Sequence, residues 1–539
     1  MSVALPPADG LGQEAGAAVA APEAPDLTGK DRLAWNVLAS WVGYLVQVMA
    51  GFVLPRLIDH HVGQARLGLW DMGWSFVSYF GLAQLGVGSS VNRYVAKHRA
   101  TGDVIGLRRV ASSVVGLNLA SAVIILMATA GAARIVPWLL GPGQAGDVGT
   151  ARWVIVLLGA SLALSTSCDV FPGVITGCHR WDVHTAVTAS GQVVVILGMV
   201  LALGLGGGLV GVAFANLVGT AVMESGRMLM AYRVCPELQI RRAYADREQA
   251  RRLFAFGAKY SVGGLARVLL VQTNNLVLLS TLGSAALAVF ARPIALVRVV
   301  ETLANKFSFV FTPTASSLQG SGRQAELIDL VLTAARWGTA LVAPLSLCLA
   351  VLADPILRLW MGPRYEHGLL LTILVVGSFL SFTQRPVGMI LAGLNLHGRL
   401  AFVSLAAAAL GCGLALQNAR LGGGLVGFAL CIAVPTFLST GLFLPFYACR
   451  TLGIPLTQFF RNTYLLPLAC CVPLAVCLVA SRVVLGQRPL LAIGVGCCVG
   501  GAVTGWLYWR HLVPAHWKAQ VGDLLIRRIA TGGARRPPE

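Results

Sequence analysis

The chain has 539 residues, of which 56% are hydrophobic and only 12% charged, about half the charged fraction of a typical soluble domain. This composition excludes a soluble enzyme built around one core and indicates membrane helices, each of which needs about 20 mostly apolar residues. The net charge of +19 would suggest nucleic acid in a soluble protein. In a membrane protein it reports topology, so no nucleic-acid partner is predicted.

Residues 1–29 are rich in Ala, Pro and Gly and are predicted to form a disordered cytoplasmic tail. The rest of the chain contains long runs without Lys, Arg, Asp or Glu, which predict an all-α bundle of about fourteen transmembrane helices. In chain order the runs are 33–55, 72–92, 110–133, 153–168, 183–223, 268–291, 337–353, 367–384, 400–419, 421–449, 462–481 and 489–509. The run 183–223 breaks at 204–208 into two helices, and a more charged helix is predicted over 285–312.

An internal repeat divides the chain. The heptapeptide LGGGLVG at 205–211 recurs unchanged at 421–427, 216 residues later, and Gly177 and Gly393 match at the same offset. Six helices per repeat give both halves the same orientation, so a pseudo-two-fold axis along the membrane normal is predicted. The predicted organisation is an N-terminal lobe 30–234, a basic cytoplasmic linker 235–255, a C-terminal lobe 256–450, two additional helices 451–510 and a basic cytoplasmic tail 511–539.

The distribution of basic residues predicts the orientation. If the helices alternate, about 27 of the 41 Lys and Arg fall on the side of the termini, which makes that side cytoplasmic by the positive-inside rule. The largest cluster surrounds the linker and is interpreted as a topology signal that contacts membrane lipids, with a regulatory site as the alternative. Its members are Arg227, Arg233, Arg241, Arg242, Arg247, Arg251, Arg252 and Lys259.

Motifs for cofactors and metals are missing from the sequence. The twelve Cys lie mostly in apolar runs without zinc-like spacing, and His60–His61 is expected in an external loop. No phosphate-binding loop or nucleophile elbow is found. We therefore predict no cofactor, no metal and no enzyme activity.

The early segment carries a recognisable pattern. It contains Pro55-Arg56-Leu57, Leu67-Gly68-Leu69-Trp70, Tyr79-Phe80-Gly81-Leu82 and Asn92-Arg93-Tyr94-Val95-Ala96. With the span count and the repeat, it resembles the polysaccharide and O-antigen flippases of the multidrug/oligosaccharidyl-lipid/polysaccharide (MOP) exporter superfamily. The resemblance implies alternating access of two lobes, a cationic central cavity and a polyprenyl-pyrophosphate-linked oligosaccharide as cargo.

Charged residues inside the predicted helices are the candidate site, because a charge in the bilayer is costly and usually faces a cavity or a partner. They are Arg267, Arg292, Arg298, Glu301, Lys306 and Arg385. The excess is cationic, and the guanidinium fork of Arg suits phosphate oxygens. Arg298 and Glu301, three residues apart, are predicted to pair. Arg267, Arg292 and Lys306 are the preferred anion contacts, with interlobe ion pairs or snorkelling as the alternative.

Three further residues, Arg56, Arg93 and Asp71, complete the predicted site. Arg56 and Arg93 lie at predicted helix ends, in the segments that carry the resemblance. Arg93 is expected at the cytoplasmic mouth of the substrate path, either to attract a headgroup or to anchor the helix. Glu301 and Asp71 are the candidates for ion coupling, because coupling requires a carboxylate within the membrane. The walls of the substrate path are expected to be the first, second, seventh and eighth helices.

Together these features predict a flippase that moves a lipid-linked oligosaccharide to the outer leaflet of a bacterial inner membrane. The expected partners are the lipid-linked cargo and the polymerase and glycosyltransferases of its pathway. A multidrug antiporter and a peptidoglycan-precursor flippase are the alternatives within the superfamily. A membrane glycosyltransferase or polymerase is a third reading, although it would need a large external loop with catalytic carboxylates.

Overall fold

The computed structural model describes residues 30–84, 87–140, 142–486, 488–515 and 518, and all regular elements in these ranges are helical. The N-terminal lobe contains α1 (Lys30–Val62), α2 (Gln64–Phe80), η1 (Gly81–Gln84), α3 (Val87–Ala100), α4 (Val104–Leu139), α5 (Val148–Ser167), α6 (Val170–Gly177), α7 (Trp181–Gly204) and α8 (Gly208–Val234). The tails predicted for 1–29 and for most of 511–539 lie outside the described residues.

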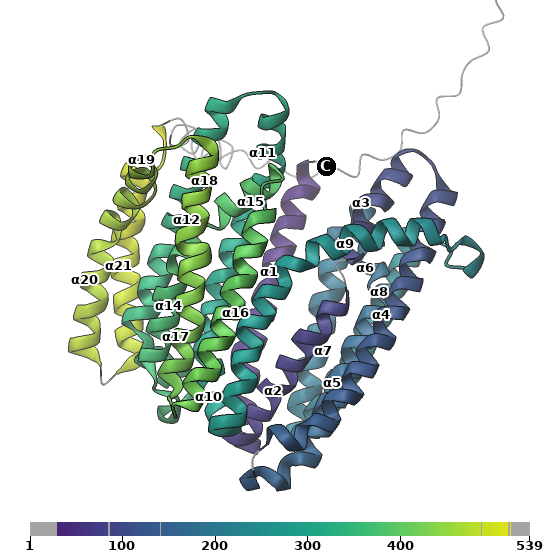
Figure 1. The fold of residues 1–539 in the computed structure, drawn as a ribbon, viewed down its shortest axis with the longest axis horizontal. Helices are drawn as coiled ribbons and strands as arrows, with labels where there is room; N and C mark the ends of the chain where they lie inside the picture. Colours follow the sequence, from purple (N-terminus) through teal and green to yellow (C-terminus); the bar gives the residue numbers. More distant parts are fainter. Residues whose placement is uncertain (1–29, 85–86, 141, 487, 516–517, 519–539) are drawn as a thin grey trace, which may run out of the picture.

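The C-terminal lobe repeats this arrangement. It contains α9 (Arg247–Val268), η4 (Leu269–Thr273), α10 (Asn274–Ser308), α11 (Phe311–Gly320), α12 (Gln324–Val351), α13 (Ala353–Met361), α14 (Gly368–Thr383), α15 (Arg385–Gly393), α16 (Gly398–Arg420), α17 (Leu425–Thr436), η6 (Phe437–Phe443) and α18 (Leu444–Leu452). Two more long helices follow α19 (Leu456–Phe460) and η7 (Arg461–Leu465): α20 (Leu466–Leu485) and α21 (Pro489–His511). They pack beside α12 at the edge of this lobe (Figure 1).

The helices are long and apolar enough for a multi-pass membrane protein. Eleven segments of the described chain meet criteria of length and hydropathy for a membrane span. The longest, Gly264–Gly320, is folded back at Gly283, where φ is 85°, so it makes two passes. α1 and the α2–α3 arm do not meet these criteria, but counting each as one segment gives fourteen helical segments in the described residues, the number predicted. The predicted all-α membrane fold is therefore confirmed, and the boundary between the seventh and eighth helices, which the sequence left overlapping, lies at Gly283.

Unusual backbone conformations recur at matched positions of the two lobes. Positive φ angles recur at equivalent turns, since His179 and Asn395 both have φ 58° and lie 216 residues apart. Gly206 (φ 74°) and Gly422 (φ 66°) lie at the same offset, inside the repeated heptapeptide. The left-handed conformation is unfavourable for residues with a Cβ, so its recurrence at matched positions reflects a common architecture.

The same close packing occurs in each lobe. A Cβ on Gly177 would lie 2.9 Å from the carbonyl oxygen of Asn92, and one on Gly393 would lie 2.6 Å from that of Thr312. Gly177 lets the short helix α6 approach α3 closely, and Gly393 lets the short helix α15 approach α11 in the same way. The matched glycines that predicted a duplication are thus explained by helix packing.

The lobes converge at one side of the protein and diverge at the other (Figure 1). We call the side of Lys30 and His511 the near side, and the side of the turns at Gly63 and Gly283 the far side. The lobes diverge toward the near side, where α9 crosses from one lobe to the other. This helix begins at Arg247, so the segment predicted as a linker, 235–255, includes its first turns.

The far side is closed by contacts between the lobes. A Cβ on Gly68 of α2 would lie only 1.8 Å from the backbone oxygen of Ser284 of α10, so the two backbones are in direct contact. Asp71 pairs with Arg292 between the same helices. Tyr365 donates a hydrogen bond to Asp59 over 2.7 Å. We call these contacts the far-side seam.

Candidate substrate cavity

A cavity of about 360 Å³ opens in the C-terminal lobe, facing α2 of the other lobe. Its walls come from α9, η4, α10, α14, α15, α16, α17 and η6, while α2 contributes Ser78. The sequence predicted that the first, second, seventh and eighth helices would form the walls of the substrate path, and of these α2, α9 and α10 line this cavity. The remaining walls come from within one lobe rather than from the boundary between lobes.

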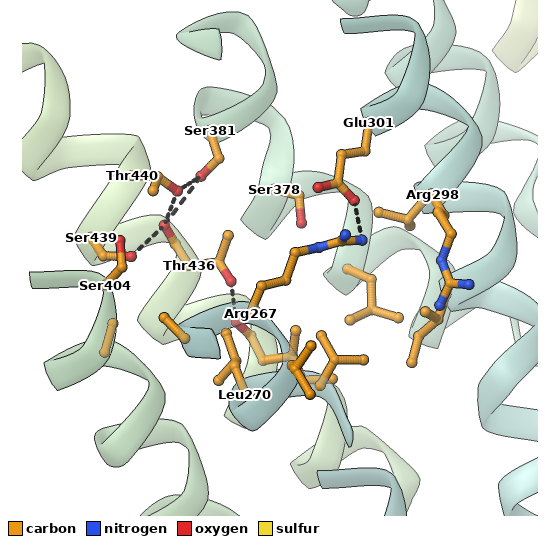
Figure 2. A pocket seen from close by; sticks show the side chains of 18 of the residues that line it. Arg267, Leu270, Arg298, Glu301, Ser378, Ser381, Ser404, Thr436, Ser439 and Thr440 are labelled. Atoms are coloured by element: carbon orange, nitrogen blue, oxygen red, sulfur yellow. Dashed lines mark hydrogen bonds and ion pairs between the residues drawn. The ribbon is translucent and has the colours of Figure 1, made fainter. Parts of the chain in front are cut away.

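One end of the cavity is cationic. Glu301 bridges two arginines: Arg267 Nη2 donates to one carboxylate oxygen over 2.7 Å and Arg385 Nη2 to the other over 2.8 Å. Arg298 lines the same end, and its guanidinium points away from Glu301 (Figure 2). This end of the cavity thus holds three guanidinium groups and a single carboxylate, which gives it an excess of positive charge.

The two arginines that bind Glu301 are accessible. Their side chains are 54% exposed for Arg267 and 37% for Arg385, while Glu301 is 9% exposed. Ion pairs with exposed members are weak because water competes for both partners. A ligand with several anionic oxygens can therefore exchange with the carboxylate for these donors.

The opposite wall of the cavity is rich in hydroxyl groups (Figure 2). Thr440 donates to Ser381 over 2.6 Å, and Ser381 donates to the backbone oxygen of Thr436 over 3.1 Å. We call this set the hydroxyl wall: Ser378, Ser381, Ser404, Thr436, Ser439 and Thr440. Hydroxyl groups both donate and accept hydrogen bonds, so this wall can bind a polar, uncharged ligand.

Two π-helical turns position the ends of the cavity. Arg267 lies two residues before η4, and Ser439 and Thr440 lie within η6. A π-turn widens a helix locally and occurs often at functional sites. Here each turn brings polar side chains to the cavity from helices whose other faces are apolar.

The structure brings four of the predicted site residues together: Arg267, Arg298, Glu301 and Arg385. The predicted Arg298–Glu301 pair is wrong, because Glu301 binds Arg267 and Arg385 instead. Spacing along one helix favoured the local pair. Tertiary packing supplies two better-placed donors from α9 and α15.

The other predicted residues lie elsewhere. Arg292 is 3% exposed and pairs with Asp71 in the far-side seam, outside the cavity lining. The Lys306 ammonium lies 4.0 Å from the centre of the Tyr44 ring, a cation–π contact. Arg56 donates to the backbone oxygen of Leu359 over 3.1 Å at the far side, and Arg93 is exposed on α3 near the opposite end.

The sequence interpretation missed the hydroxyl wall and Glu224. Ser and Thr are common in membrane helices, where they bond to their own backbone, so their convergence has no signal in sequence alone. Glu224 gives no such signal, because the uncharged run 183–223 ends one residue before it and places it beyond the predicted helix. In the structure α8 continues to Val234, and Glu224 is 2% exposed.

The fold and the cavity define a two-lobed, multi-pass membrane protein with a polar cavity in its C-terminal lobe. The structure is similar to an inward-facing transporter of the multidrug resistance MATE family of the MOP superfamily, with a TM-score of 0.65 at 17% identity over 77% of this chain and 96% of that one. It is also similar to the lipid II flippase MurJ in an inward closed conformation, with a TM-score of 0.64 at 11% identity over 89% of this chain and all of that one. At such identities the likeness concerns the fold.

The sequence comparisons define the family. A profile of the polysaccharide biosynthesis protein family matches residues 84–368, more than half of the chain. The chain is 24% identical over 441 residues to EpsK, an uncharacterized membrane protein of Bacillus subtilis (strain 168), which covers 79% of this chain and 85% of EpsK. The chain therefore belongs to the polysaccharide biosynthesis protein family, and it shares its fold with the MOP-superfamily transporter described above. The two solved structures of similar fold are described as a transporter and as a flippase.

Proposed function

We propose that the protein flips a polyprenyl-pyrophosphate-linked oligosaccharide, a polysaccharide precursor, across the membrane. The observation that carries this proposal is the pairing of a cationic end with a hydroxyl wall in one cavity. A diphosphate suits the guanidinium groups of Arg267 and Arg385, and sugar hydroxyls suit the Ser and Thr side chains opposite. The membership of a polysaccharide biosynthesis family supports the same cargo class.

Glu301 acts in this proposal as an exchangeable counter-ion. Without cargo it pairs with both arginines and compensates part of the positive charge of the cavity. A diphosphate offers more anionic oxygens than one carboxylate, so it displaces Glu301 from at least one guanidinium. The prenyl chain stays in lipid throughout, because each of its buried methylene groups is worth about 0.8 kcal/mol.

The near side is the proposed cytoplasmic side, and the membrane is the bacterial inner membrane. Both termini then lie in the cytoplasm, in agreement with the excess of Lys and Arg on that side. Cargo enters where the lobes diverge, past exposed residues such as Arg93. Lobe rocking opens the far-side seam and delivers the headgroup to a polymerase. The glycosyltransferases that supply the cargo act in the cytoplasm.

The proposal is tested with purified protein in liposomes and a fluorescent polyprenyl-diphosphate-linked sugar. Headgroup exposure is followed with an impermeant quencher. Arg385→Ala removes one phosphate contact and is expected to slow flipping at least tenfold, since a charge-assisted hydrogen bond contributes about 1.5–3 kcal/mol. The matched control is Arg323→Ala, which breaks an exposed pair with Glu326 away from the cavity. Equal rates for the two variants would contradict the proposal.

Two alternatives within the superfamily give different outcomes in the same liposomes. A peptidoglycan-precursor flippase also carries a diphosphate and would prefer lipid II over other prenyl-linked sugars. A multidrug antiporter would move organic cations and ignore the lipid. The surplus of arginines over carboxylates at the cavity disfavours a cationic cargo.

A further inference from the structure

The repeat gives several residues of the cavity a counterpart in the N-terminal lobe. The offset of 216 residues is fixed in this region by the matched turns at His179 and Asn395 and at Gly206 and Gly422. Applied to the cavity, it pairs Arg385 with Asp169, Ser404 with Thr188, and Thr440 with Glu224. The charge is inverted, because a cationic residue is replaced by an acidic one and a hydroxyl by a carboxylate.

The counterpart residues form a buried polar cluster. Glu224, 2% exposed, accepts a hydrogen bond from Arg227 Nη1 over 2.6 Å. Arg227 Nη2 also donates to Thr188 over 3.1 Å. His184 on α7 and Asp169 beside α6 interact electrostatically with Arg227. The cavity of one lobe thus corresponds to a site in the other that is filled by the chain's own ion pair.

This cluster has too few hydrogen-bond partners. Three buried atoms lack a partner among the described residues: Glu224 Oε2, Arg227 Nε and His184 Nδ1. A buried polar atom without a partner costs about 1–3 kcal/mol, and more where it is charged. The second carboxylate oxygen of Glu224 therefore has no donor to stabilise its negative charge, and protonation of this oxygen would remove that charge.

We propose that the N-terminal lobe binds a proton at Glu224, in the pseudo-symmetric counterpart of the C-terminal cavity. The charged and titratable groups around it are Arg227 on α8, His184 on α7, and Cys168 and Asp169 at the end of α5. Protonation converts the ion pair into a neutral acid beside Arg227, whose charge then acts on the carboxylate of Asp169. The proton comes from the aqueous phase and bonds to Oε2.

A proton fits this site better than a metal ion. Within the described residues, no group of three or more His, Cys, Asp and Glu side chains is arranged to hold a metal. The guanidinium of Arg227 already occupies the coordination space of Glu224 at 2.6 Å and would repel another cation. A proton needs no such space because it becomes part of the carboxyl group.

Proton binding does not depend on the proposed cargo, whereas the use of that proton to drive flipping does. Glu301 and Asp71, which the sequence offered for ion coupling, have other partners: Glu301 is held by two arginines and Asp71 by Arg292 across the seam. Glu224 is paired within one lobe, so its protonation changes that lobe alone. Glu224 is therefore the better candidate for a site that binds and releases a proton without breaking the far-side seam.

The test measures the infrared band of protonated carboxyl groups in the purified full-length protein during a pH titration without cargo. Glu224→Gln is expected to remove a component of this band. Glu301→Gln, which alters a carboxylate held by two arginines, is expected to leave that component in place. A titrating band that is unchanged by Glu224→Gln would overturn the proposal.

A second variant covers the case in which Glu224→Gln fails to fold. Arg227→Gln removes the cation that favours the ionised form, so the proton affinity of Glu224 is expected to rise at least tenfold. An unchanged titration midpoint would overturn the proposal.

In liposomes, a proton gradient is expected to speed flipping by the native protein but not by Glu224→Gln. If Glu224 titrates and no lipid is flipped, the proposed function fails while the proton site stands.

Discussion

Two carboxylate–arginine clusters of the protein, one in the far-side seam and one in the cavity, have opposite environments. In the seam Arg292 is 3% exposed and Asp71 is 15% exposed. In the cavity Glu301 is buried to a similar degree, yet its partners Arg267 and Arg385 are half-exposed. The same chemical pair is thus shielded from water in one place and open to exchange in the other.

The difference separates two roles for charge in the membrane. Losing one partner of a buried pair destabilises the protein strongly, because the remaining charge is neither paired nor solvated. A pair with exposed arginines is replaced readily by water or by a ligand. The seam therefore holds the lobes together on the far side, and the cavity keeps its arginines available for an anion.

The largest expected effect comes from breaking the pair in the seam. Asp71→Asn leaves Arg292 buried without a counter-charge and is expected to cost about 3–5 kcal/mol. The loss appears as a lower thermal unfolding midpoint in detergent, or as lobes that separate on the far side in distance measurements between spin labels. Glu301→Gln is the matched change in the cavity and is expected to cost less than about 1 kcal/mol.

The swapped pair Asp71→Arg with Arg292→Asp serves as the control for this prediction. It restores opposite charges across the seam and is expected to recover most of the lost stability. Equal costs for Asp71→Asn and Glu301→Gln would remove the distinction between the two clusters.

A smaller effect is expected from the backbone contact in the seam. A Cβ on Gly68 would lie 1.8 Å from the Ser284 backbone oxygen, and overpacking of this kind costs about 1–3 kcal/mol. Gly68→Ala is therefore expected to push the lobes apart on the far side. The control is Gly51→Ala in α1, where no atom lies within 4 Å of the added Cβ. If the two variants gave the same far-side distances, the seam would not depend on this contact.

Much of the fold was predictable because periodicity and repetition are properties of the sequence itself. Apolar runs located the helices, and the heptapeptide repeat and the Gly177–Gly393 match revealed the duplication. The turn at Gly283 was not predicted, because an apolar run continues through it without a charged or proline break. A single glycine with positive φ is enough to reverse the chain there.

The candidate site was predictable only in part. Intramembrane charge identified Arg267, Glu301 and Arg385, because such residues are costly and need a partner or a cavity. Their pairing was not predictable, since it depends on how α9, α10 and α15 approach one another. The same limit explains Arg292, whose partner Asp71 is 221 residues away in sequence.

The smallest expected effect concerns the outer edge of the seam. Tyr365 is 1% exposed and its hydroxyl donates to Asp59 over 2.7 Å, across the lobes. Tyr365→Phe removes this hydrogen bond but keeps the ring, and the half-buried Asp59 can bind water instead. The expected cost is about 1 kcal/mol, seen as a roughly fivefold change in the ratio of closed to open far sides. A change as large as that of Asp71→Asn would show that the seam is held at its edge rather than by the buried pair.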